Sequence, residues 1–545
     1  MDWMERQVSR QGPRAGAMVC LLASFAVSAA APVTAQQQPS EPEVTRMPLM
    51  TKVLGPYSRP ISTTSPTARA YFDQGLQMVY AFTHSVAIRS FEEAQRQDPT
   101  CAMCYWGEAL ARGPFLNGGL RDANVGPAHE AAGRALALLD ERSTAVERAL
   151  IEAMAVRYEE EQQPDTRAAL DSAYSDLMAE AYRAHPTDPD VGALYAESLM
   201  LLNPVRAQYQ ATDPFVQSVH GVLEGVLARN ITHPGACHLY IHATEATAVA
   251  ERAEACADHL GQAIPGASHI NHMPSHTYNQ IGRWASAVRA NLDAWHSDQR
   301  AEFGEGVSYA ATHNLHMLLF AASMDGQGAV AALAGKEYAK VVTDGAFYHA
   351  LALLRFGRFD EILSLGEAPE RELQRGLWDF ARGYAHLRSG SPDSARVYLA
   401  RVDEAADTLP ESVTMRGHTA ADLLGITGDI LRGELLLSEG RSEEAIAAFE
   451  AAVRTHDGLR YDEPEPLNFS ARHWLGAALL EAGRHAEAEQ VYRAALEQHP
   501  RNGWSLYGLE DAVRAQGRAE EGDRVHADFE EAWERSDTMI RSSRF

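Results

Sequence analysis

The sequence predicts an all-α protein, a solenoid of stacked helix-turn-helix repeats. Small and aromatic residues recur at fixed offsets in several parts of the chain, and two histidine pairs repeat at a separation of 34 residues. A fixed period of this length is typical of helical repeats, in which each unit buries its apolar face against its neighbours. The length of 545 residues also exceeds what one compact core usually supports. We therefore expect a repeat array.

The first 35 residues predict a signal peptide. Arg6, Arg10 and Arg14 precede an apolar run over residues 15–31, and small residues at 33–35 form a cleavage site. This pattern indicates a Sec-type exported protein, periplasmic in a bacterium. In the alternative, the segment is not cleaved and anchors the protein, although about 17 apolar residues are marginal for spanning a bilayer. We expect no other contact with a membrane.

Residues 36–66 predict a flexible linker, because they are rich in proline, serine, threonine and glutamine and lack a periodic apolar pattern. Helical repeats follow from residue 67 onward. We expect an N-terminal array over residues 67–330 and a C-terminal array over residues 331–545. The reason is an interruption of the repeat pattern near Gly326–Gly335.

Four stretches carry the residue types that form the contacts between repeat helices. Each has a glycine in its first helix, then an alanine and a large apolar residue in its second. The sets are Gly75, Ala87, Phe91, Ala94 and Pro99; Gly383, Ala395 and Leu399; Gly433, Ala445, Phe449 and Ala452; and Gly476, Ala488, Tyr492, Ala495 and Pro500. These spacings resemble tetratricopeptide repeats. The resemblance implies a concave groove that holds a protein or peptide partner.

The chain is strongly acidic, with a net charge of −26. Nucleic-acid-binding surfaces are basic, so we expect no nucleic acid partner. An acidic surface suits solubility and the attraction of cations. We also expect no nucleotide cofactor.

Four cysteines remain if Cys20 is removed with the signal peptide, an even number that suits an oxidising compartment. Cys101 and Cys104 could form a disulfide, a redox pair or a metal clip, or remain as unpaired thiols. Covalent haem attachment needs a histidine directly after the second cysteine, and Tyr105 occupies that position. The sequence therefore predicts no covalent haem.

Two histidine pairs are the strongest indication of function. His238 and His242, and likewise His272 and His276, are four residues apart, which places both imidazoles of a pair on one face of a helix. The separation of 34 residues places the two pairs at the same positions of consecutive repeats. Adjacent helices would then direct four imidazoles into one space, and imidazole is the commonest metal ligand in proteins.

The tetratricopeptide register adds further residues to this stripe, because the resemblance implies which positions of each first helix face the groove. The predicted metal ligands are His238, His242, His269, His272, His276, His313 and His316, with Glu245 one turn beyond His242. We expect these side chains to converge on a concave surface rather than in the core.

Mixed nitrogen and carboxylate ligands suit zinc, copper or iron, and the set is large enough for one or two ions. A pH-sensing cluster and a groove that holds a peptide carboxylate are alternatives. Pro274 lies between His272 and His276. It either kinks that helix and re-aims His276 or simply occupies a first turn.

Longer motifs resemble a group of exported bacterial tetratricopeptide repeat proteins. The resemblance covers most of residues 68–510 and implies the fold and export, but not an activity. The motifs are Cys101-Ala102-Met103-Cys104-Tyr105-Trp106-Gly107, His233-Pro234-Gly235-Ala236 with Tyr240-Ile241-His242, His272-Met273-Pro274-Ser275-His276, His313-Asn314, Arg460-Tyr461-Asp462-Glu463-Pro464, and Asn502-Gly503-Trp504-Ser505-Leu506.

The sequence therefore predicts an exported tetratricopeptide repeat scaffold whose histidine-lined groove binds one or two transition metal ions, a partner, or both. One alternative is a scaffold that binds protein or peptide and no metal. Another is a metal-dependent hydrolase or oxidase of unknown substrate, which needs an open coordination position. No HExxH sequence occurs among these histidines, so a zincin-type peptidase is not supported. Whether the protein is an enzyme is left open.

Overall fold

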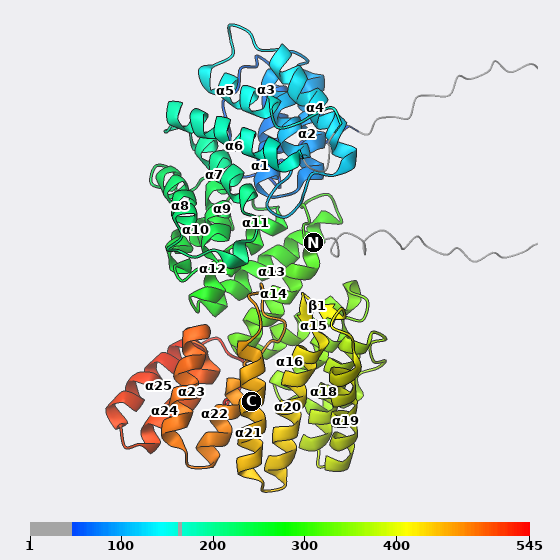
Figure 1. Ribbon diagram of the computed structural model, residues 1–545, viewed down its shortest axis with the longest axis vertical. Coiled ribbons are helices and arrows are strands. Elements are labelled where there is room, and N and C mark those ends of the chain that lie inside the picture. Colours follow the sequence, from blue (N-terminus) through cyan, green and yellow to red (C-terminus); the bar gives the residue numbers. More distant parts are fainter. Residues whose placement is uncertain (1–45, 162–165, 545) are drawn as a thin grey trace, which may run out of the picture.

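The computed structural model describes residues 46–161 and 166–544, and the predicted signal peptide, residues 1–35, lies outside them. The described chain is almost entirely helical, which confirms the all-α prediction. Figure 1 shows the helices stacked along the long axis of the molecule, from blue and cyan at the top to orange and red at the bottom. No helix in the described ranges is long and apolar enough to cross a membrane.

The N-terminal helices follow one another in antiparallel pairs. They are α1 (Pro66–Tyr80), α2 (His84–Gln97), α3 (Ala102–Arg112), α4 (Asp122–Ala137), α5 (Ala145–Ala155), α6 (Arg167–Ala184), α7 (Pro189–Leu202), the short 3₁₀ helix η1 (Arg206–Gln208), α8 (Pro214–Leu227) and α9 (Pro234–Thr244).

The middle of the chain contains the 3₁₀ helix η2 (Ala250–Ala253) and the helices α10 to α15. The α-helices are α10 (Glu254–Leu260), α11 (Ser268–His272), α12 (Pro274–Gln280), α13 (Trp284–Ala301), α14 (Ala311–Met324) and α15 (Gly328–Val341).

The C-terminal part contains the remaining helices and one small antiparallel hairpin. These elements are α16 (Ala346–Arg355), α17 (Phe359–Ser364), α18 (Glu372–Arg388), α19 (Pro392–Thr408), β1 (Thr414–Met415), β2 (His418–Thr419), α20 (Ala420–Ser438), α21 (Ser442–Asp457), α22 (Arg472–Glu481), α23 (His485–Gln498), α24 (Gly503–Ala515) and α25 (Ala519–Trp533).

Close approach at glycines explains the repeat pattern. Phe91 in α2 is fully buried, and a Cβ on Gly75 in α1 or on Gly107 in α3 would lie 2.7 or 2.3 Å from its ring. Tyr492 in α23 packs on Gly476 in α22 in the same way, where the distance would be 2.4 Å. A side chain at any of these glycines would push the helices apart, because interiors are close-packed. The contacts predicted from the spacings are therefore those that join the helices.

The boundary that we placed between residues 330 and 331 is wrong. It falls inside α15, which packs on α14 on one side and on α16 on the other. The glycines near residues 326–335 suggested an interruption, but Gly335 instead lets α15 approach the backbone of α16 closely, since a Cβ there would lie 2.8 Å from Cα of His349. The helical array continues through this region.

The flexible linker predicted over residues 36–66 is also wrong for its described part. Residues 46–65 run over the N-terminal helices, and Val53 is 1% exposed. Gln77 in α1 accepts from the Gly55 N–H at 2.8 Å and donates to the Tyr57 carbonyl at 2.7 Å. Arg59 pairs with Asp190 in α7 at 2.6 Å. The amino-acid composition does not indicate this packing, because polar side chains of the helices form the hydrogen bonds that the extended backbone of this segment needs.

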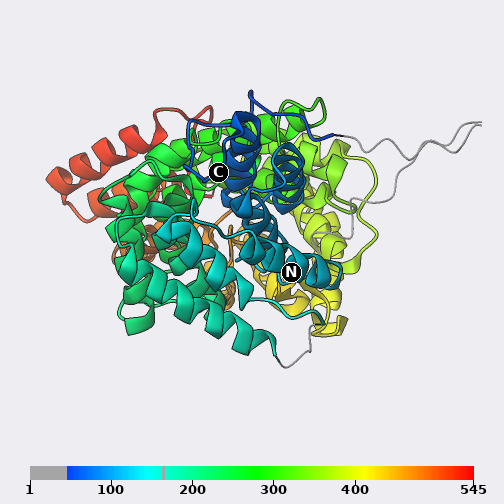
Figure 2. The same ribbon diagram turned by 90° about the horizontal axis from the view of Figure 1, so that it is seen from above.

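The C-terminal helices fold back on the middle of the chain. Trp504 in α24 donates from its indole nitrogen to the carbonyl of Ser323 in α14 at 2.9 Å. Asp537, beyond α25, accepts from the N–H of Gly328 at the start of α15 at 2.7 Å. In Figure 2, seen from above, the red C-terminal helices and the yellow-green helices lie on opposite sides of the molecule. The lower part of the array therefore curves and closes on itself.

Replacing Phe91 by alanine tests the repeat contact. The change should leave a cavity among α1, α2 and α3, and such changes cost about 3–5 kcal/mol of unfolding free energy. Phe303 is the matched control because it is 81% exposed. Phe303→Ala should change the unfolding free energy by less than about 0.5 kcal/mol. Urea denaturation followed by circular dichroism measures both, and equal losses in the two variants would contradict this role for the buried ring.

Candidate metal centre

Three neighbouring parts of the array carry the predicted histidines. His238 and His242 lie on α9, which Glu245 caps, and their ring centroids are 4.9 Å apart. His272 ends α11 and His276 lies on α12, with ring centroids 4.7 Å apart. His313 belongs to the first turn of α14, and its ring centroid is 4.7 Å from that of His272. Equivalent helices of successive repeats thus bring the rings together.

Pro274 divides the helix that the sequence predicts around His272 and His276. It is the first residue of α12, and Met273 before it keeps helical backbone angles, φ −50° and ψ −37°. Proline lacks an N–H, so the hydrogen-bond ladder is interrupted there. At this interruption, Nε2 of His272 lies 2.8 Å from Nε2 of His276.

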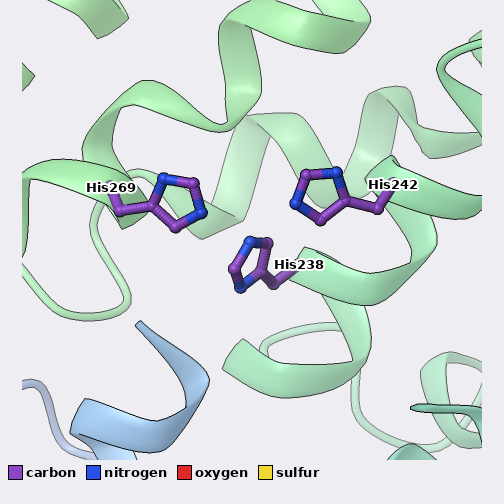
Figure 3. Close-up of side chains that lie close together, drawn as sticks. All are labelled: His238, His242 and His269. Carbon is purple, nitrogen blue, oxygen red and sulfur yellow. The ribbon is translucent and has the colours of Figure 1, made fainter. Parts of the chain in front are cut away.

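His238, His242 and His269 form the first histidine group, in which one ring nitrogen of each residue lies within 4.8 Å of the others. Figure 3 shows the three rings facing one another across a small space. All three side chains are buried, with exposures of 1–3%. Nε2 of His238, Nε2 of His242 and both nitrogens of His269 have no hydrogen-bond partner among the described residues. Buried polar atoms normally have a partner, so these nitrogens require one.

The opposite ring nitrogens of two of these residues are held in place. His238 Nδ1 lies 2.7 Å from the carbonyl oxygen of Tyr80, and His242 Nδ1 lies 2.8 Å from Oε1 of Glu245. A carbonyl or carboxylate oxygen only accepts, so Nδ1 of each ring carries the proton and Nε2 presents a lone pair to the group. Metal-ligating histidines commonly show this arrangement.

Burial keeps the first group neutral. It lowers the pKa of His238 to about 3, and it holds the pKa values of His242 and His269 well below their usual range. Neighbouring histidines and Arg206 lower these pKa values further, because a second positive charge nearby disfavours protonation. At neutral pH the three imidazoles therefore offer lone pairs rather than protons.

His272, His276 and His313 form the second histidine group, again with one ring nitrogen of each within 4.8 Å of the others. His272 Nδ1 lies 2.8 Å from the side-chain oxygen of Asn291 in α13, which orients that ring. Burial lowers the pKa of His272 to about 3 and holds that of His313 well below its usual range. Two of the three imidazoles, those of His272 and His313, are therefore neutral and offer lone pairs as the first group does.

His276 differs because two carboxylates face it. Its Nδ1 lies 2.6 Å from Glu245 and 3.2 Å from Glu463. Burial alone would lower the pKa of His276, but the two carboxylates outweigh burial and raise the pKa to about 10. The ligand atoms of these three residues also lie within 4.8 Å of one another. The second group therefore has two carboxylates beside one of its rings, whereas the first group has one, Glu245 at Nδ1 of His242.

Glu245 joins the two groups, since its other oxygen contacts His242 in the first. The carboxylate is 1% exposed, and Arg206 from η1 approaches it to 3.7 Å. A buried carboxylate is costly unless it is paired. The prediction that Glu245 lies among these histidines therefore agrees with the structure.

Glu463 is a residue that the sequence reasoning missed. It lies in the loop of residues 458–471 between α21 and α22, and Figure 1 shows this orange segment reaching up toward α14. Glu463 belongs to the motif of residues 460–464, but a loop residue occupies none of the groove positions, which all lie on the repeat helices. No helical periodicity indicates where such a loop will lie.

His316 does not join either group, which corrects its place in the predicted ligand set. Its ring lies 4.4 Å from that of Tyr348, between centroids, and 6.3 Å from that of Tyr338. Because His316 lies three residues after His313 on α14, its side chain points in a different direction, toward α15 and α16. His316 is buried there at 2% exposure.

The open concave surface expected around the histidines is wrong as well. The ring of Phe82, from the turn between α1 and α2, covers the first group at 4.2 Å from His238 and 5.3 Å from His269, between centroids. The loop that carries Tyr461 and Glu463 covers the second group. The rings converge, but they do so inside the protein.

Both cysteine pairs form disulfides, Cys101 with Cys104 and Cys237 with Cys256. The first pair is thus a disulfide, and its sulfurs do not serve as a metal clip. The second joins α9 to α10 next to His238. It ties α9, the helix that carries two of the three ligands of the first group, to its neighbour α10.

Solved structures of repeat proteins are similar to the chain at low identity. The TPR domain of P58(IPK) is 13% identical over 83% of this chain and 99% of that one, with a TM-score of 0.21. Cut9–Hcn1 of the APC/C is 11% identical over 86% and 76%, with a TM-score of 0.29, and the human IFIT1 dimer with PPP-AAAA is 11% identical over 87% and 91%, with a TM-score of 0.28. Such low scores carry no argument about function. No curated protein matches the chain.

A family model gives a more local result. Residues 430–503 match the tetratricopeptide repeat family. Within that segment, Phe449 of α21 packs on Gly433 of α20, where a Cβ would lie 2.5 Å from the ring. Phe91 makes the same contact with Gly75 at the other end of the array. The matched segment and the helix pairs that repeat its packing thus indicate a solenoid of tetratricopeptide-type helix pairs.

Proposed function

We propose that this tetratricopeptide repeat protein binds transition metal ions in its buried histidines, one ion in each group. The observation that carries the proposal is the set of partnerless buried nitrogens on His238, His242 and His269. A metal ion accepts three lone pairs at once, and three neutral imidazoles form a known zinc-type ligand set. Apolar packing gives no reason for three such rings to face one another.

The second group supports the same proposal with a different ligand set. His272 and His313 are neutral, and the carboxylates of Glu245 and Glu463 lie beside His276. A divalent cation would compensate these two negative charges, of which Glu245 is buried and Glu463 is partly buried. Mixed imidazole and carboxylate ligands suit zinc or iron, whereas the all-imidazole first group suits zinc or copper.

Tetratricopeptide repeats bind other proteins, and the protein is a scaffold of this kind. We propose that the metal ions stabilise the part of the scaffold that α9, α12 and α14 form. Metal bound to the folded state alone raises stability by mass action.

We also propose that the protein is exported and acts in the bacterial periplasm. The apolar run of residues 15–31 after three arginines supports a signal peptide. The pairing of Cys101 with Cys104 and of Cys237 with Cys256 supports an oxidising compartment, because disulfides persist there.

A cavity of about 60 Å³ adjoins the second group and favours a catalytic role as the second candidate function. His276, Glu463 and Tyr461 line it together with Trp284 and His499. A cavity of this size holds a few water-sized molecules. A metal ion in the second group with one position open to the cavity could activate water for hydrolysis, and Glu463 could then hold a proton.

Metal content tests the main proposal. Protein purified without an affinity tag and incubated with zinc, copper(II) or iron(II) should retain about two ions per chain, one for each three-histidine set. His238→Ala with His269→Ala should remove about one ion, and His272→Ala with His313→Ala should remove the other. Elemental analysis after removal of excess metal measures the ratio.

The matched control is His259→Ala with His296→Ala, because both of these histidines are exposed. This variant should keep both ions. If the wild-type chain retains none of the three metals, the proposal is wrong, and the scaffold functions without metal.

Cobalt(II) substitution tests the open position. Azide added to the loaded protein should change its visible absorption spectrum, because azide binds a metal position that is open to the cavity. The His272→Ala/His313→Ala variant should not respond, since its remaining ion lies in the enclosed first group under Phe82. An unchanged spectrum of the doubly loaded wild-type protein would rule out the catalytic candidate.

A further inference from the structure

Residues 540–544 lie inside the C-terminal helices rather than beyond them. After α25 the segment of residues 540–544 returns into the array, where Ile540 is 9%, Ser543 1% and Arg544 7% exposed. Figure 1 shows the last described residues, near the letter C, among α20, α21 and α22. Few apolar side chains hold the segment there, so polar contacts determine its position.

One buried arginine binds the backbone of this segment. Arg355 at the end of α16 donates from Nη1 to the carbonyls of Ser543 and Arg544 at 3.2 and 2.7 Å. Its guanidinium is fully buried and lies 3.6 Å from the ring centroid of Trp504. If the segment left, this buried cation would lose both carbonyl acceptors, which is costly.

Further residues bind the two terminal side chains of the segment. Ser543 donates from Oγ to the carbonyl of His473 at 2.7 Å, and its Oγ lies 2.8 Å from the hydroxyl of Tyr492. Arg544 donates to Glu434 at 3.0 Å and also pairs with Glu481.

The carboxylate of Glu434 is 4% exposed and therefore needs a cation nearby. Arg388 approaches it only to 3.8 Å, and that arginine is 38% exposed. Arg544 thus supplies the closer charge. The helices recognise one serine, one arginine and the backbone between them.

We propose that these residues form a peptide-binding site, the tail site, defined by Arg355, Glu434, His473, Glu481 and Tyr492. Its resident ligand is the chain's own segment of residues 540–544. In place of this segment it accepts an extended basic peptide with a Ser–Arg sequence from a partner protein. The two glutamates select a basic partner, because an acidic segment would place like charges together.

The segment can leave without unfolding α25. Ser536 and Asp537 hold the preceding residues to Gly326 and Gly328 at 2.9 and 2.7 Å, so the exchange involves only residues beyond this anchor. The inference is independent of metal binding, since none of the tail-site residues belongs to the histidine groups.

A labelled peptide tests the proposal on the full-length chain. The probe is fluorescein-labelled Ile-Arg-Ser-Ser-Arg, the sequence of residues 540–544, with an amidated end. Ser543→Ala with Arg544→Ala should release the tail and bind the probe at least tenfold more tightly than the wild-type chain, whose tail site is occupied. Adding Glu434→Gln and Glu481→Gln should abolish binding. Fluorescence polarisation measures each affinity.

Arg541→Ala is the matched control, because Arg541 is an exposed arginine of the same segment. This variant should bind the probe no better than the wild-type chain. Equal binding by the wild-type and released variants, or binding that survives the glutamate changes, would overturn the proposal.

Trypsin gives a second readout that does not depend on the released variant folding. Cleavage after Arg541 requires the segment to leave the tail site, so the wild-type chain should lose its end at least tenfold more slowly than a free peptide of residues 536–544. Mass spectrometry follows the loss. Cleavage of both at the same rate would show that the tail site does not hold the segment.

Discussion

The buried carboxylate of Glu245 is the interaction on which the centre of the molecule depends. One oxygen lies 2.8 Å from His242 on the same helical segment, and the other lies 2.6 Å from His276 on the next repeat. Arg206 approaches from a third element. A charge taken out of water must keep its partners, so the relative positions of α9, α12 and η1 are constrained together. Both histidine groups depend on that arrangement.

The repeat itself determines why the histidines can meet at all. Aromatic rings such as Phe91 pack on glycines of the helices before and after them, and this close approach sets the spacing between repeats. Equivalent positions of successive repeats then lie side by side. His238 and His272 occupy such positions, so residues that are 34 positions apart in the sequence lie close together in space. The metal proposal follows from this geometry together with the burial of the rings.

Segments that are distant in the sequence complete the second histidine group and the tail site. The loop of residues 458–471 crosses from the C-terminal helices and brings Glu463 to 3.2 Å from His276. The segment of residues 540–544 returns past α25 and places Arg544 against Glu434. In each case a charged side chain meets a buried partner far away in the sequence. Other parts of the same chain thus fill the interior of this tetratricopeptide array, which differs in this respect from an array with an open groove.

The sequence by itself determined the helical array, the contacts of its glycines and aromatic residues, and the convergence of His238, His242, His272 and His276. These features depend on neighbours in the chain, and periodicity records them directly. Only the tertiary structure decided that the rings are buried, that Glu463 joins them and His316 does not, and that residues 46–65 pack on the helices. Such contacts arise when distant segments close over one another, and the polar partners that satisfy them leave no periodic pattern in the sequence.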